Sequence, residues 1–195
     1  MLIAYNNAFT NYKVSHFDSI YVYLFYVSFV SMQLVEYFIW RNLTNVVYNH
    51  LFSLVGAILL FLQPISSIML ITTNVAMRNR LIMSYLTMAV PYGTYKLYTG
   101  PINSSVSKMG HLRWNFLNNA IVWIVWLFFF LFSFFVRHSW SSMAAGISLL
   151  AVAFVNFRND NSMGSMWCWL ANSSMIYWAT YILLYLPFYK HKSVC

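Results

Sequence analysis

The sequence predicts an all-α membrane protein, a compact bundle of about six transmembrane helices joined by short loops. Two observations predict it. Hydrophobic residues make up 61% of the 195 residues and charged residues only 7%, whereas a soluble domain carries about 25% charged residues. Apolar stretches of spanning length also follow one another along the chain and leave room only for short loops and tails. We therefore treat residues 1–195 as one transmembrane helical-bundle domain.

The individual spans are defined by runs of apolar residues. We expect them at residues 17–40, 48–73, 80–98, 116–136, 140–157 and 165–188. The first run is apolar except for Gln33 and Glu36. Pro64 predicts a kink in the second run. The third run holds Pro91 and Lys96, which predicts a broken or tilted span.

The later segments differ more strongly in composition. The polar stretch TGPINSSVSKMGHLRWN precedes the fourth span and is expected to be the longest loop. The fourth span contains AIVWIVWLFFFLFSFFV, the clearest run of all. In the fifth span, small residues recur at helical spacing, which favours close helix packing. The sixth span ends near Pro187.

The charge balance points to membrane lipids as partners. Eleven Lys and Arg against three acids give a net charge of +8, but the cations are scattered over the loops, as expected for residues that flank spans and meet anionic headgroups. No nucleic-acid-binding signature accompanies them. Three acids cannot build a two-metal site, and no H-E-x-x-H motif is present, so we expect no metal and no cofactor. The sequence leaves open whether the chain forms a homo-oligomer.

The orientation in the membrane follows from an even number of spans, which places both termini on one side. Basic residues divide almost evenly between the two sides and decide little. Two glycosylation-type triplets begin at Asn42 and Asn103, on the side opposite the termini. We therefore expect cytoplasmic termini.

Polar side chains inside the expected spans gather toward the side opposite the termini. Because polar groups in a bilayer need partners, the simplest arrangement is a polar cavity between helices, open to that side. The predicted lining is Gln33, Glu36, Arg113, Asn119, Asn156, Arg158, Cys168 and Asn172.

Glu36 is the acid that lies clearly inside an expected span, and two interpretations of it stand side by side. It forms a site for a proton, a cation or a headgroup ammonium, or it forms a structural ion pair with Arg113, Arg158 or Lys96. Cys168, which lies between two tryptophans, is interpreted as a small packing residue rather than a nucleophile.

Three short stretches carry a resemblance. SMQLVEYFIWRNL at 31–43, LQPI at 62–65 and NSMGSMWCWLAN at 161–172 resemble small, uncharacterised multi-pass membrane proteins of large DNA viruses and of their algal or protist relatives. The resemblance implies a viral or protist membrane protein, in a viral or host internal membrane. It supplies no mechanism.

Three functions follow as hypotheses. The first is a non-enzymatic protein that binds or conducts a small polar or cationic species through the one-sided cavity. The second is a structural or assembly protein of a viral or internal membrane. The third is a membrane-embedded lipid-modifying enzyme with Glu36 or Cys168 at its site. Substitution of Glu36 by Gln separates them.

Overall fold

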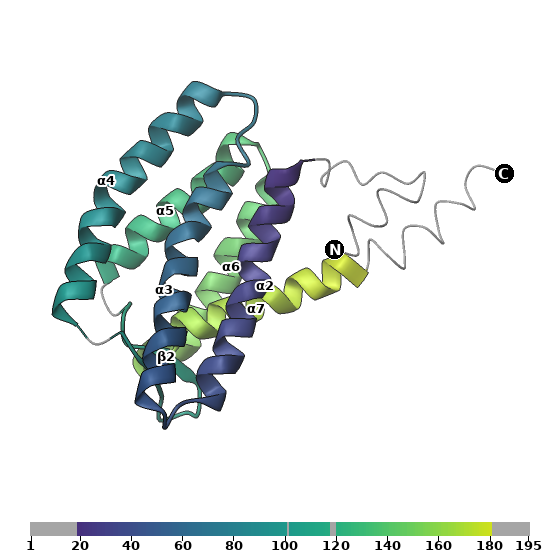
Figure 1. Cartoon of the computed structure of the whole chain (residues 1–195). Coiled ribbons are helices and arrows are strands. Elements are labelled where there is room, and N and C mark those ends of the chain that lie inside the picture. The colour runs from purple at the N-terminus through teal and green to yellow at the C-terminus, as the bar shows by residue number, and fades with distance from the viewer. Residues whose placement is uncertain (1–18, 101, 118–119, 181–195) are drawn as a thin grey trace.

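A computed structural model describes residues 19–100, 102–117 and 120–180, in which six α-helices are accompanied by a small hairpin (Figure 1). The helices are α2 (Ile20–Arg41), α3 (Val46–Ile68), α4 (Val75–Thr99), α5 (Ala120–Val136), α6 (Trp140–Phe157) and α7 (Met163–Thr180). A 3-10 turn, η1 (Arg158–Asp160), links the last two. The predicted all-α fold with six helices is confirmed for these residues.

The predicted membrane spans are confirmed in part. In the described residues, three helices are long and apolar enough to cross a membrane: α2, α3 and α6 with its following turn, Trp140–Asp160. The 17 residues of α5 extend about 26 Å, less than the roughly 30 Å of a hydrocarbon core. Helix α4 is long but carries Arg78, Arg80 and Lys96. The end of the sixth expected span lies outside the described residues.

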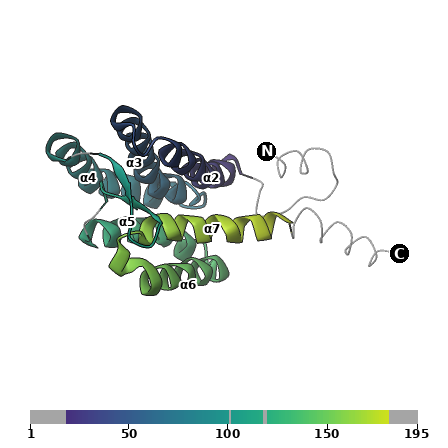
Figure 2. The same ribbon diagram turned by 90° about the horizontal axis from the view of Figure 1, so that it is seen from below.

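Successive helices run up and down, and the hairpin lies at the end where α2 ends and α3 begins (Figure 1). Helix α7 lies between α6 and the layer formed by α2, α3 and α4 (Figure 2). The hairpin is therefore at the opposite end of the bundle from Ile20.

The expected long polar loop folds into this hairpin, which corrects the prediction. Strand β1 (Ser104–Val106) pairs antiparallel with β2 (Leu112–Trp114). The connecting turn is closed by a hydrogen bond from the Ser107 N–H to the His111 carbonyl at 2.8 Å. Gly110 has φ +80° there, a conformation that glycine adopts without strain.

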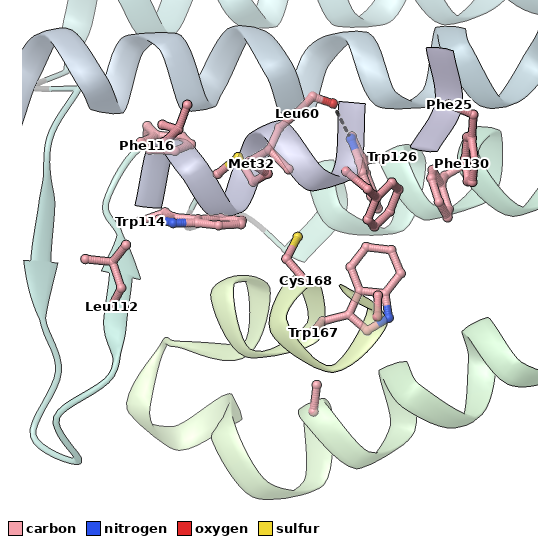
Figure 3. Close-up of a cluster of buried hydrophobic side chains, with 14 of the residues drawn as sticks. Phe25, Met32, Leu60, Leu112, Trp114, Phe116, Trp126, Phe130, Trp167 and Cys168 are labelled. Atoms are coloured by element: carbon pink, nitrogen blue, oxygen red, sulfur yellow. Dashed lines mark hydrogen bonds between the residues drawn. The ribbon is translucent and has the colours of Figure 1, made fainter. Parts of the chain in front are cut away.

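Aromatic rings fill the centre of the bundle (Figure 3). Phe130 of α5 stacks on Trp126 at 4.9 Å between ring centroids and lies 5.4 Å from Phe29 of α2. Trp167 of α7 meets Trp126 edge-on at 5.4 Å. Each such pair adds roughly 0.5–1.5 kcal/mol beyond area burial. These contacts hold α2, α5 and α7 together.

The opposite face of α2 is apolar as well. Leu24, Val27, Val30 and Leu34 are each more than half exposed, although they are spaced as one helical stripe. A helix that is apolar on both its core face and its outer face fits a lipid environment, where outward apolar side chains carry no cost.

Pro64 inside α3 frees one backbone carbonyl for a neighbouring helix. Proline has no N–H, so it cannot bond the carbonyl of Leu60 one turn earlier. The indole N–H of Trp126 from α5 donates to that carbonyl instead, at 2.6 Å (Figure 3). The next carbonyl, of Phe61, accepts the hydroxyl of Tyr85 from α4 at 2.9 Å.

We expect Trp126→Phe to destabilise the protein although the aromatic ring is kept. The substitution leaves the buried Leu60 carbonyl without a donor, which costs about 1–3 kcal/mol. Thermal unfolding of the full chain in detergent measures this. Trp140→Phe is the control, because Trp140 is 52% exposed. Equal stability of the two variants would show that the Leu60 carbonyl finds another partner.

Candidate functional site

The polar end of the bundle is built around the docked hairpin. Asn49, buried in the first turn of α3, pairs with the backbone of Ser104 as a neighbouring strand would: its amide donates to the carbonyl and its oxygen accepts from the N–H, both at 2.9 Å. The Ser53 hydroxyl meets the Ser104 hydroxyl at 2.9 Å. His50 Nδ1 contacts the Ile102 carbonyl at 2.8 Å.

The tip of the hairpin rests on the corner between α6 and α7. Asp160 accepts hydrogen bonds from the side chains of Ser107 and Ser162. The His111 ring meets Phe157 edge-on at 5.1 Å. Polar groups from both ends of the hairpin are thus used to hold it on the bundle.

Glu36, a residue of α2, lies under the hairpin and faces α7 and β2. Its side chain is 6% exposed. Gln33 Nε2 donates to Glu36 Oε2 at 3.3 Å, and Ser165 and Trp114 lie beside the carboxyl group without hydrogen-bond geometry. All three partners are neutral, and in the described residues no Lys or Arg joins them. The structure therefore does not contain the ion pair that was one interpretation of this residue.

Hydrogen bonding in this cluster is incomplete. Glu36 Oε1 and the indole nitrogens of Trp114 and Trp167 are buried without a hydrogen bond. Cys168 is fully buried next to Glu36, and Figure 3 shows it in the same cluster as Trp114. Asn172 donates to the Cys168 carbonyl at 2.9 Å and to the Phe29 carbonyl of α2 at 3.5 Å.

We expect Glu36→Gln to fold with equal or higher thermal stability, because it removes a buried charge that has no opposite charge beside it. The glutamine oxygen still accepts from Gln33. Glu36→Ala should lower the unfolding temperature, since it leaves Gln33 unpaired and opens a cavity. If Glu36→Gln destabilises the full chain as much as Glu36→Ala, the negative charge is required after all.

A separate polar pocket of about 380 Å³ lies on the other side of the hairpin. Its lining is Lys96, Gly100, Ile102, Asn103, Arg113, Asn115 and Phe116. Arg113 reaches it because successive residues of a strand point to opposite faces: Trp114 turns toward Glu36 and Arg113 turns away.

Hydrogen bonds orient the polar groups of this pocket. Arg113 Nε donates to Asn115 Oδ1 at 3.1 Å and to Ser105 Oγ at 3.2 Å. Asn115 Nδ2 donates to Asn103 Oδ1 at 2.8 Å. Both hydrogen bonds of Arg113 within the described residues use Nε, so its two terminal amino groups are available to a ligand.

The eight predicted lining residues therefore fall into separate groups. Gln33, Glu36, Cys168 and Asn172 lie together in the enclosed cluster. Arg113 lines the polar pocket. Asn156 of α6 and Arg158 of the following turn η1 are exposed, and Arg158 lies over the Phe154 ring at 5.2 Å. Asn119 lies outside the described residues.

Several functional candidates were missed by sequence reasoning. Asn49 was one, because the polar loop was not expected to form a strand that could pair with it. Asn103 was another: Asn115 was expected on the polar side, but only the register of the hairpin, with Ser104 opposite Trp114, brings Asn103 to it.

No protein-family model matches the sequence, and neither a curated protein nor a solved structure is significantly similar to it. Within residues 19–100, 102–117 and 120–180, no group of three His, Cys, Asp or Glu side chains could hold a metal ion.

Proposed function

We propose that this chain is a multi-pass membrane protein that binds an anionic group, a phosphate or a carboxylate, in the pocket between α4 and the hairpin. The observation that carries the proposal is that Lys96 and Arg113, from two separate elements, line one pocket whose lining contains no acidic residue. The three apolar helices support the membrane location.

The pocket has the donors that an oxyanion needs. A guanidinium presents paired N–H groups that match two oxygens of a carboxylate or phosphate, and an ammonium adds a second charge. The Arg113 side chain is half-buried and its Nε is fixed by Asn115, so little freedom is lost when a ligand binds. A half-buried pair of cations is also screened less by salt than an exposed pair.

A cation fits this pocket less well than an anion. The expectation of a cationic species rested on Glu36, which does not line the pocket. Binding is also favoured over conduction, because the stacked rings of Phe29, Trp126, Phe130 and Trp167 fill the bundle centre.

The test is ligand-induced thermal stabilisation of the purified full chain in detergent. We expect glycerol 3-phosphate and inorganic phosphate to raise the unfolding temperature, by an amount that grows with ligand concentration as binding to the native state requires. Choline should not. Lys96→Gln and Arg113→Gln should each weaken binding about tenfold or more, since a charge-assisted hydrogen bond contributes about 1.5–3 kcal/mol.

Matched controls are Lys108→Gln and Arg158→Gln, which remove one exposed positive charge each outside the pocket. Both should bind as the unmodified chain does. The proposal is overturned if all four variants lose the same stabilisation, which would indicate nonspecific charge attraction, or if choline stabilises the protein and the two anions do not.

A further inference from the structure

A second, apolar groove adjoins the polar pocket. It lies between α3, α4 and α5 and has a volume of about 380 Å³, within the range of about 300–1,000 Å³ of small-molecule sites. Phe61, Ala89, Gly93 and Val125 are among its apolar lining residues. The groove exists because α4 packs weakly on the bundle: Tyr85 is the one residue of this 25-residue helix that is buried.

The groove and the polar pocket share three residues. Lys96, Ile102 and Phe116 line both. Lys96 is half-buried and places its ammonium group 6.0 Å from the centre of the Tyr92 ring. Tyr92 lines the groove too, and its hydroxyl is buried without a hydrogen-bond partner. The apolar groove thus ends beside two cations, Lys96 and Arg113, and beside the unpaired hydroxyl of Tyr92.

We propose that the ligand is an anionic lipid whose acyl chain lies in the groove between α3, α4 and α5 while its phosphate is held by Lys96 and Arg113. This proposal rests on the proposed function and names its ligand class. The site matches both parts of such a lipid. Apolar side chains along the groove face the acyl chain, and two positive charges at its mouth face the phosphate.

The headgroup distinguishes this site from ordinary lipid contact. Any lipid can cover an apolar helix face, but choline and ethanolamine headgroups place a positive charge beside the phosphate. That charge is disfavoured near Lys96 and Arg113, whose pocket contains no acid. A lipid with a glycerophosphate headgroup avoids the repulsion, and its phosphate can accept from the terminal amino groups of Arg113.

Gly93 offers a way to block the groove alone. A Cβ atom added there meets no atom within 4 Å, and Gly93 lines the groove, so a side chain that starts at this position enters groove space. In a helix interior, replacement of glycine also tends to stabilise. Gly93→Leu should therefore fold, and Thr87→Leu places the same side chain at an exposed position of this helix that does not line the groove.

The experiment is native mass spectrometry of the full chain released from detergent, titrated with 1-oleoyl glycerol 3-phosphate and with 1-oleoyl glycerophosphocholine. We expect a single high-affinity lipid for the phosphate monoester, at least tenfold tighter than for the choline lipid. Gly93→Leu should abolish this tight binding, while Thr87→Leu should leave it unchanged. Glycerol 3-phosphate should still stabilise Gly93→Leu in the thermal assay.

The outcomes separate the two proposals. If the oleoyl lipid binds no more tightly than glycerol 3-phosphate, or if Gly93→Leu binds it as the unmodified chain does, the acyl-chain site is wrong and the anion pocket stands. If neither lipid nor glycerol 3-phosphate depends on Lys96 and Arg113, both proposals fail. Equal affinity for the phosphate and choline lipids would leave only general lipid contact, which overturns the inference.

Discussion

Replacement of Gly164 by alanine should destabilise the protein, although alanine is normally the better helix residue by about 0.5–1 kcal/mol. A Cβ atom at Gly164 would lie 2.6 Å from the Trp123 ring and 3.0 Å from the Trp114 ring. Both are bulky indoles in a packed environment, so they cannot move aside freely. Overpacking of this kind costs about 1–3 kcal/mol.

Gly93→Ala is the matched control and should have the opposite sign. Its new Cβ meets no neighbouring atom, so only the helical preference of alanine acts, and the unfolding temperature should rise. Both variants are compared by thermal unfolding of the full chain in detergent. Stabilisation by Gly164→Ala would mean that α7 does not approach β2 and α5 as closely as described.

Asn49→Ala is expected to loosen the hairpin. It removes both partners of the Ser104 backbone and leaves a buried N–H and a buried carbonyl unsatisfied, at about 1–3 kcal/mol each. Arg113, Asn103 and Asn115 depend on the hairpin for their positions. Affinity for glycerol 3-phosphate should therefore fall together with stability, although Asn49 does not line the pocket.

Asn156→Ala provides the comparison. Asn156 is exposed and its amide donates to the Val152 carbonyl of its own helix, so its loss should change stability by less than about 0.5 kcal/mol. Hydrogen exchange of the hairpin amides offers a local measurement. Unchanged protection of the hairpin in Asn49→Ala would show that its docking depends on other contacts.

Helix positions could be predicted because they depend on local composition. The run containing AIVWIVWLFFFLFSFFV forms α5, and the Pro64 segment forms α3. Two features of the fold depend on contacts between elements and could not be predicted from local composition. The polar stretch before α5 was expected to be a loop, since three-residue strands carry too little sequence signal. One of the two interpretations of Glu36 gave it charged partners, because depth along a helix does not specify which neighbour faces a side chain.

The sequence by itself determined that the chain forms apolar helices. That property follows from residue type and spacing alone. Only the tertiary structure decided which polar groups meet. Asn49 pairs with Ser104 over 55 positions of sequence, and strand alternation sends Trp114 to Glu36 and Arg113 to Lys96. The physical reason is that hydrogen bonds and charge contacts depend on distances between elements, which helix packing and hairpin register set.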